Sequence, residues 1–261
     1  MKAALVTGGS SGIGLALSRR LALQGRPLLW ASLSEDEIEG AKSAIRHSIP
    51  DARIHGLAID LAEPGAAQAV FDWATARADI DLLVNNAGFG AYGESRSLDL
   101  DREQGMIAVN AGALHALTRL FLRRMEDTGG GTIVNLASNS AFTPTPNLAV
   151  YAATKAFVKH YSEALAQELK AAGSPVRVMT VCPSAVADTP FLHAADMDGV
   201  RTFTSFTATT AEEVAGDVMA GLEQGAEFVL TGAAMRRAYW LMKILPAPLV
   251  RMMVRREVTR V

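Results

Sequence analysis

Short apolar runs alternate with longer amphipathic stretches along most of the 261 residues. The apolar runs predict buried strands at 2–6, 27–31, 54–59, 80–84, 132–136, 176–181 and 227–230. The longer stretches have helical periodicity and predict helices at 15–23, 35–47, 66–76, 102–125, 151–171 and 211–222. Strands that alternate with helices of this length predict an α/β fold. Its sheet is expected to be parallel and doubly wound, with about seven strands and helices on both faces.

No compositional break divides residues 1–232, so we expect a single domain there. Within it, residues 189–210 form an irregular stretch rich in Thr, Phe and Ala, between a predicted strand and a predicted helix. Such a stretch is either a mobile lid over a site or an ordinary surface excursion. Residues 233–261 form a basic tail with seven Lys or Arg and one acid. Its formal charge is +6, which leaves −8 over residues 1–232.

The tail also has apolar residues at helical spacing. Ala238, Leu241, Met242 and Leu245 recur three or four residues apart, and prolines follow at 246 and 248. A basic amphipathic segment can pack on its own domain, cover a substrate entrance, contact a second subunit or lie on an anionic membrane surface. We favour packing on its own or a partner subunit, with peripheral membrane contact as the less favoured alternative.

Composition narrows the class of protein. Hydrophobic residues make up 49% and charged residues 20% of the chain, and the formal net charge is −2. These values describe a globular protein and give no reason to expect nucleic acid as a partner. Cys182 is the only cysteine, so we expect no internal disulfide, no bound metal and a cytoplasmic location. The first glycine turn comes too early for a signal peptide, and no uninterrupted apolar run reaches the roughly 20 residues that span a membrane.

A glycine-rich turn follows the first predicted strand. It reads Thr7-Gly-Gly-Ser-Ser-Gly-Ile-Gly14 and leads directly into a predicted helix. In a strand, turn and helix of this kind, phosphate groups can approach the backbone N–H groups at the helix N-terminus. Glycines are needed where a side chain would block that approach or where φ is positive. The alternative is a tight turn that binds no ligand.

Polar and glycine residues follow several of the predicted strands. Gly8, Asp60, the segment 85–88, Ser138 and Pro183 each come where a strand ends. In doubly wound sheets, ligands bind beyond the carboxyl ends of the strands, so these residues are expected to share one site. For Asp60 the alternative is a helix-entry residue ahead of the next helix.

Tyr151 and Lys155 are four residues apart in a predicted helix, so their side chains share one face. An ammonium group near a phenol favours the phenolate and lowers the pKa of the phenol from about 10. A shift of roughly 3 units would make this phenol an effective acid or base near pH 7. The alternative is a pair on a solvated helix face, which the same spacing also produces.

Taken together, these motifs identify a family resemblance. The chain resembles the short-chain dehydrogenases/reductases in their single-domain form over residues 2–231. The matching motifs are Thr7-Gly-x-x-x-Gly12-Ile-Gly14, Asn85-Asn-Ala-Gly88, Asn110, Ser138 and Tyr151-x-x-x-Lys155, in the family order. The resemblance implies a Rossmann-type fold, a bound nicotinamide dinucleotide, and hydride transfer to or from a carbonyl carbon.

The resemblance also implies roles for individual residues. Tyr151 would donate the proton in reduction or accept it in oxidation, and Lys155 would lower the pKa of Tyr151 and hold the nicotinamide ribose. Ser138 would hydrogen-bond the substrate oxygen, with Ser140 as the alternative, while Asn139 would shape the pocket. Asn110 would bind a water that links Lys155 to solvent.

The implied cofactor contacts fall on the glycine turn and on the segments that follow later strands. They are Gly8, Ser10, Ser11, Gly12, Ile13, Gly14, Ser32, Leu33, Asp60, Leu61, Asn86, Ala87, Gly88, Tyr151, Lys155, Pro183, Ser184, Val186 and Thr189. An acidic residue at the end of the second strand would favour NAD, and an arginine would favour NADP. Residues 30–34 supply neither, so NADP(H) is the preferred prediction because no carboxylate repels a 2′-phosphate. NAD(H) is the alternative, since Ser11 is not basic.

The chain departs from the family pattern after the sixth strand. Ser184 stands where the family often has glycine after proline, and Asp188 occupies the usual place of a threonine that contacts the nicotinamide. Thr189 comes one residue late, and we predict that it serves after a local shift. Loss of this contact would instead weaken or alter the activity.

The sequence does not identify the substrate. The candidate pocket residues are mostly apolar, which suits a hydrophobic carbonyl compound or alcohol; they are Phe89, Tyr92, Phe142, Thr143, Pro144, Asn147, Phe191, His193 and Phe203. The favoured prediction is an NADP-preferring reductase of ketones or aldehydes that forms a homodimer or homotetramer. The alternatives are an NAD-linked alcohol dehydrogenase and a dinucleotide-binding sensor or scaffold without turnover.

Overall fold

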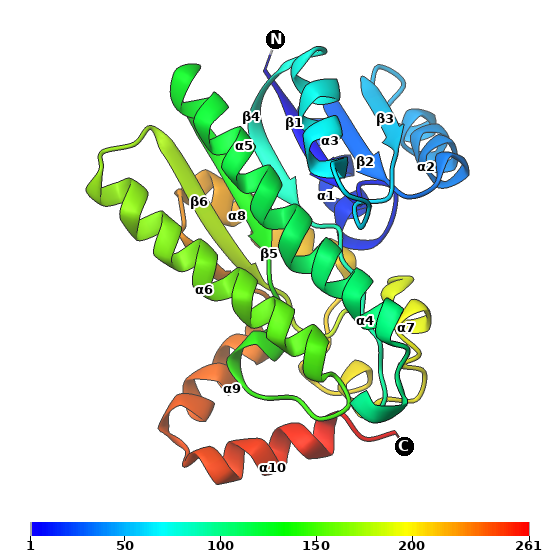
Figure 1. Ribbon diagram of the computed structural model, residues 1–261, viewed down its shortest axis with the longest axis vertical. Coiled ribbons are helices and arrows are strands. Elements are labelled where there is room, and N and C mark those ends of the chain that lie inside the picture. Colours follow the sequence, from blue (N-terminus) through cyan, green and yellow to red (C-terminus); the bar gives the residue numbers. More distant parts are fainter. Residues whose placement is uncertain (1, 261) are drawn as a thin grey trace.

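The computed structural model, which describes residues 2–260, has a seven-stranded sheet with helices on both faces (Figure 1). All neighbouring strands are parallel, in the order β3-β2-β1-β4-β5-β6-β7. The strands are Lys2–Thr7 (β1), Leu28–Ser32 (β2), Ile54–Ala58 (β3), Asp79–Asn85 (β4), Gly131–Leu136 (β5), Val176–Cys182 (β6) and Phe228–Leu230 (β7). The predicted fold class is confirmed, and no predicted strand boundary is wrong by more than one residue.

Two hydrophobic cores lie on opposite faces of the sheet because side chains alternate along each strand. In β1, Ala4 and Val6 face one core, while Ala3 and Leu5 face the other. The first core is covered by Gly12–Leu23 (α1), Glu35–Ser48 (α2) and Ala211–Gln224 (α8). The second is covered by Ala66–Thr75 (α3), Leu114–Asp127 (α5) and Ala149–Ala171 (α6).

The helix predicted at 102–125 is interrupted. It consists of Leu100–Ile107 (α4), a π-helical segment Ala108–Ala113 and α5. A π segment inserts a wider turn into a helix and occurs frequently at functional sites. Taken together, α4, the π segment and α5 span Leu100–Asp127, and among the described helices only this one is long and apolar enough to cross a membrane. Half of its most apolar stretch is buried inside the protein. We therefore assign it as a core helix.

Residues 189–210 contain two short helices, Phe191–Ala194 (α7) and the 3-10 turn Arg201–Phe203. A β-bridge between Val186 and Thr209 closes the base of this segment, and a second bridge joins Val200 to Arg260. The tail forms two helices, Ala233–Ile244 (α9) and Ala247–Glu257 (α10). Both lie below the carboxyl ends of the strands, on the side of the molecule away from the N-terminus (Figure 1).

The turn after β1 and the turn after β4 are held together at the carboxyl edge of the sheet. The Thr7 hydroxyl accepts hydrogen bonds from the backbone N–H groups of Asn86 and Ala87, at 3.0 and 2.9 Å. The Asn86 amide donates back to the carbonyls of Thr7 and Gly8. The order of the strands reverses at β1 and β4, which is where ligands bind in doubly wound sheets.

Candidate active site

A cavity of about 1000 Å³ runs along the carboxyl edge of the sheet. One end is lined by the glycine turn, the middle by Ser138, Tyr151 and Lys155, and the far end by residues of α9 and α10. A single open space therefore connects the predicted cofactor segments to the C-terminal helices.

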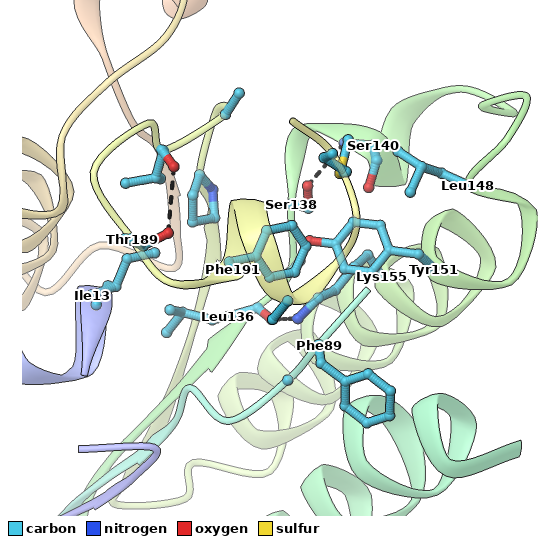
Figure 2. A pocket seen from close by; sticks show the side chains of 18 of the residues that line it. Ile13, Phe89, Leu136, Ser138, Ser140, Leu148, Tyr151, Lys155, Thr189 and Phe191 are labelled. Carbon is cyan, nitrogen blue, oxygen red and sulfur yellow. Dashed lines mark hydrogen bonds between the residues drawn. The ribbon is translucent and has the colours of Figure 1, made fainter. Parts of the chain in front are cut away.

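The predicted catalytic residues come from two elements. Ser138 follows β5, whereas Tyr151 and Lys155 lie one turn apart near the start of α6, and Figure 2 shows their side chains around the same space. The Ser138 hydroxyl accepts a hydrogen bond from the Ser140 backbone N–H at 3.2 Å. Lys155 Nζ is buried and donates to the Leu136 carbonyl at 2.9 Å. This hydrogen bond fixes the ammonium at the end of β5.

The electrostatics of this pair differ from the prediction. Burial raises the pKa of Tyr151 to about 12, and a hydrogen bond with the Ser138 side chain lowers it less strongly. Burial also lowers the pKa of Lys155 to about 8. The predicted lowering of the phenol pKa by Lys155 is wrong for this structure, because desolvation of the phenolate outweighs the attraction of an ammonium that lies 5.8 Å from the ring centroid. At neutral pH, Tyr151 therefore carries its proton.

Asn110 lies in the π-helical segment and is fully buried. Its side chain accepts from the Phe89 backbone N–H at 3.0 Å and donates to the Phe89 carbonyl at 2.9 Å and to Thr154 Oγ1 at 3.2 Å. Asn110 does not line the cavity. Instead it fixes the backbone that follows Gly88, where an added Cβ would lie 2.9 Å from Asn110 Oδ1 and 3.3 Å from Lys155 Nζ.

The glycine turn has the geometry of a phosphate cradle. Gly8 and Gly12 have φ values of 63° and 51°, a region that favours glycine. Ser11 is the N-cap of α1 but makes no side-chain capping hydrogen bond within residues 2–260, so N–H groups of the first turn remain available to an anionic group. The residues present therefore fit the pyrophosphate of a dinucleotide.

Gly14 packs tightly against the turns that follow β1 and β4. It does not line the cavity, and an added Cβ would lie 2.1 Å from the Gly8 carbonyl oxygen and 2.6 Å from Asn86 Nδ2. Gly14 therefore allows the close packing of α1 against the turn after β1, and its contact with a cofactor stays a prediction.

The other predicted cofactor residues all line the cavity. They are Gly8, Ser10, Ser11, Gly12, Ile13, Ser32, Leu33, Asp60, Leu61, Asn86, Ala87, Gly88, Tyr151, Lys155, Pro183, Ser184, Val186 and Thr189. Asp60 also accepts a hydrogen bond from the Ala62 backbone N–H at 2.8 Å, so it shapes the turn toward α3 as well.

Glu37 is a cavity residue that the sequence did not single out. It lies in the first turn of α2, lines the cavity beside Ser32 and Leu33, and accepts a hydrogen bond from the Ser10 hydroxyl at 3.4 Å. Three consecutive acidic residues, 35–37, open this helix, and the sequence offers no means of selecting the one that faces the glycine turn.

Comparisons with known proteins show the family of this chain. The family model described as short chain dehydrogenase matches residues 2–198. A 1-deoxy-11-beta-hydroxypentalenate dehydrogenase from Streptomyces avermitilis is 36% identical over 236 residues, covering 88% of this chain and 84% of the relative. The chain belongs to the short-chain dehydrogenase/reductase family. It is therefore an NAD(P)-dependent oxidoreductase.

Solved structures of short-chain dehydrogenases share the fold. One from Sphingobium yanoikuyae, in complex with NADPH, is 27% identical with a TM-score of 0.80 and covers 94% of this chain and 97% of that chain. One from Burkholderia phymatum, in complex with NAD, is 24% identical with a TM-score of 0.80 and covers 91% of each chain. The latter supports the fold alone.

The departure from the short-chain dehydrogenase/reductase pattern after β6 is accommodated in the structure. Only Asn147 and Asp196 among the described non-glycine residues have left-handed φ values, so Ser184 does not need the freedom of glycine. Its hydroxyl lies 3.0 Å from Thr209 Oγ1. Asp188 accepts from the Ala211 backbone N–H at the start of α8, whereas Thr189 lines the cavity beside Gly12. Thr189 is thus the residue of this pair that faces the cofactor end.

Four of the nine candidate pocket residues line the cavity, namely Phe89, Thr143, Phe191 and Phe203. The five others do not line it: Tyr92, Phe142, Pro144, Asn147 and His193. Two of these five make polar contacts elsewhere. The Tyr92 hydroxyl donates to the Val258 carbonyl at 2.7 Å, and His193 Nδ1 lies 2.7 Å from Asp198 Oδ1.

The C-terminal helices contribute to this short-chain dehydrogenase/reductase cavity, which agrees with the alternative that the tail covers a substrate entrance, although the sequence did not single out the lining residues. Its far end is lined by Met235, Ala238, Met242, Met253, Val254, Glu257 and Val258. The helical spacing of Met235, Ala238 and Met242 was the available signal, because it places these residues on one face.

Proposed function

We propose that this protein reduces the carbonyl group of a ketone or aldehyde with a hydride from NADPH, and that Tyr151 donates the proton. The proposal depends chiefly on one observation: Ser138, Tyr151 and Lys155 lie along a cavity that also contains the glycine turn. On this proposal, a proton donor, a hydroxyl hydrogen-bond donor and a cation would lie beside the space that a nicotinamide would reach.

The chain's own groups would act on the substrate oxygen. A bound nicotinamide supplies the hydride to the carbonyl carbon. As the C=O π electrons move to oxygen, that oxygen takes the Tyr151 proton, and the Ser138 hydroxyl hydrogen-bonds the developing negative charge. Lys155, held near the tyrosine by Leu136, would stabilise the tyrosinate until it regains a proton from solvent. A Tyr151 pKa of about 12 suits donation, because the proton is present at neutral pH.

The proposed substrate is bulky and hydrophobic. Phe89, Leu148, Phe191, Met197 and Phe203 contribute an apolar lining to the middle of the cavity, while α9 and α10 extend it. We propose residues 189–210 as the substrate lid, since much of this segment lines the cavity and its base is closed by the Val186 and Thr209 bridge. On this basis residues 1–232 are the catalytic domain and residues 233–261 a tail that completes the substrate end.

Two features act in opposite directions on the choice of cofactor. The absence of a carboxylate at Ser32 and Leu33 permits a 2′-phosphate, and the 27%-identical relative was solved with NADPH. The Glu37 carboxylate, beside Ser10, disfavours a second negative charge nearby. We retain NADP(H) as the proposed cofactor and assign to Glu37 the role of limiting that preference.

Replacing Glu37 by Gln is expected to raise the ratio of kcat/KM for NADPH to that for NADH by roughly fivefold to tenfold. This corresponds to about 1 to 1.4 kcal/mol of repulsion at a solvent-accessible position. Steady-state kinetics with both cofactors measure the ratio. The matched control is Glu35→Gln, since Glu35 lies in the same helical turn but does not line the cavity. Equal ratios in both variants would remove Glu37 from cofactor selection.

The alternative reaction is NAD-linked oxidation of an alcohol. It is favoured by the name of the 36%-identical relative, which is a dehydrogenase of a hydroxylated compound. A panel of bulky ketones and aldehydes with NADPH, and of the matching alcohols with NADP and NAD, separates the two directions. We expect faster turnover with carbonyl compounds at pH 7. Binding of cofactor without turnover of any compound in either panel would instead support the sensor or scaffold alternative.

We also propose that the protein is a homodimer or homotetramer. Three large apolar side chains are exposed on α4 and α6: Leu100 and Ile107 at the two ends of α4, and Phe157 in α6. Exposed apolar side chains of this kind suit burial against another copy of the chain. Light scattering after size-exclusion chromatography measures the mass of the assembly.

A further inference from the structure

The outer face of the two C-terminal helices is unusually apolar for an exposed surface. Twelve large hydrophobic side chains are exposed among the described residues, and six of them lie between residues 240 and 253. They are Trp240, Leu241, Ile244, Leu249, Met252 and Met253; Met253 also lines the cavity, so the other five form the outer face. Trp240 and Ile244 are 68% and 79% exposed, so they contribute little to the core. A concentration of apolar surface such as this marks an interaction site.

The C-terminal segment that contains these two helices carries seven Lys or Arg side chains, and most of them have no carboxylate partner within residues 2–260. Arg236 and Arg260 pair with Asp217 and Asp196. The five others have no ion pair with a residue in the described range 2–260. They are Arg237, Lys243, Arg251, Arg255 and Arg256. Residues 233–261 carry a net charge of +6, so this segment attracts an anionic partner.

Apolar and basic residues share the outward face of α9. Arg237, Trp240, Leu241 and Ile244 are spaced three, four and seven residues apart, so they lie in one stripe. Lys243 lies beside this stripe, with its ammonium 5.1 Å from the centroid of the Trp240 ring and 4.8 Å from that of Tyr239. An aromatic ring close to a cation at an exposed position is typical of the membrane interface.

Helix α10 repeats this arrangement. Leu249, Met252 and Arg256 are spaced three and seven residues apart, and Arg255 follows Met252 by three residues. The opposite side of α10 is occupied by Val250, which is buried, and by Val254 and Val258, which line the cavity. Each of the two helices thus has an inner face that is buried or lines the cavity, and an outer face that is both apolar and basic.

We propose that the outer face of α9 and α10 docks on the surface of an anionic phospholipid bilayer. The exposed apolar side chains would enter the interface between headgroups and acyl chains, and the five unpaired cations would lie at the level of the phosphates. A second copy of this chain fits less well, because a two-fold contact would place these cations opposite the same cations. The proposal concerns binding and does not depend on the reaction that the protein catalyses.

Vesicle co-sedimentation with the purified full-length protein tests this proposal. We expect the protein to bind vesicles of phosphatidylcholine with 30% phosphatidylglycerol, to bind pure phosphatidylcholine vesicles at least tenfold more weakly, and to be released from the anionic vesicles by 0.5 M NaCl. Trp240→Ser with Ile244→Ser removes apolar contacts, and Arg251→Glu with Arg255→Glu reverses two charges. Each double variant is expected to bind anionic vesicles at least tenfold more weakly than the wild type.

Matched controls lie elsewhere on the surface. Leu23→Ser removes an apolar side chain that is 69% exposed on α1, and Arg123→Glu reverses an exposed charge on α5. Both should bind as the wild type does. Equal binding to neutral and anionic vesicles, or equal loss in the control variants, would overturn the proposal. The proposal would also be overturned if the wild type did not bind vesicles. Loss of self-association in the Trp240 and Ile244 double variant, measured by light scattering, would then assign this face to a contact between copies.

Discussion

Replacement of Tyr151 by Phe is expected to lower kcat for carbonyl reduction by about 10³-fold, because general acid catalysis contributes 10² to 10⁴ and the phenol is the proposed proton donor. The substitution removes only the hydroxyl, so the ring keeps its tilted contact with Phe191, at 5.4 Å between centroids. Cofactor binding, measured by quenching of protein fluorescence, should stay within a few fold of the wild type.

Tyr161→Phe is the matched control for this change. Tyr161 lies ten residues further along α6, does not line the cavity, and its buried hydroxyl has no hydrogen-bond partner among the described residues. Removing that hydroxyl should leave kcat unchanged. Carbonyl-dependent NADPH oxidation that survives in Tyr151→Phe would contradict the assignment of the proton donor.

Replacement of Lys155 by Met is expected to lower kcat/KM by at least 10²-fold while leaving the thermal midpoint at pH 7 no lower than that of the wild type. Catalysis should fall because the ammonium that stabilises the tyrosinate is lost. Stability should not fall, because burial of the ammonium is unfavourable, as the lowering of the Lys155 pKa to about 8 indicates. This gain offsets the loss of the hydrogen bond to the Leu136 carbonyl.

The pH dependence of stability distinguishes this explanation from a general packing effect. Between pH 8 and about 10.5, the unfolded lysine keeps its proton while the folded one has lost it, so wild-type stability contains a contribution that rises with pH in this window. Lys155→Met lacks that contribution. Thermal midpoints at pH 7 and 9.5 should therefore show the wild type gaining relative to the variant. A Lys159→Met control removes a lysine that pairs with Glu163 outside the cavity and keeps Lys155, so it should gain relative to Lys155→Met as the wild type does.

The sheet could be predicted closely because its central strands β1, β2, β4, β5 and β6 are mostly buried. Runs such as 132–136 and 176–181 carry apolar residues on both faces of the sheet, and the helical periods between such runs favour parallel pairing. The interruption at Ala108–Ala113 could not be predicted in this way. A π segment keeps the helical direction and changes one turn, so its apolar pattern resembles that of a continuous helix. The local signals were Asn110 and Gly112, which are both poor helix formers.

Within the site, the limits of prediction have a physical cause. Motif spacing predicts that Ser138, Tyr151 and Lys155 lie together, because Ser138 follows one predicted strand and the other two share one face of the next predicted helix. The sign of the Tyr151 pKa shift depends on how much water the surrounding side chains exclude, which spacing does not encode. The position of Glu37 depends on the rotation of α2 against β2 and β3. The cavity lining from α9 and α10 depends on how the tail returns beneath the sheet, far from the motifs in the sequence.

The base of residues 189–210 is closed by backbone hydrogen bonds between Thr209 and residues 185–187. Thr209 N donates to the Ala185 carbonyl and its own carbonyl accepts from Ala187 N–H, at 2.9 and 3.1 Å. These two hydrogen bonds anchor the segment at both ends, independently of the side chains between them. For the proposed lid, we expect substitutions away from Phe191, whose ring lies 5.4 Å from that of Tyr151, to change the accepted compound without displacing Ser138, Tyr151 or Lys155. Selection for a new substrate has a route here that leaves the chemistry intact.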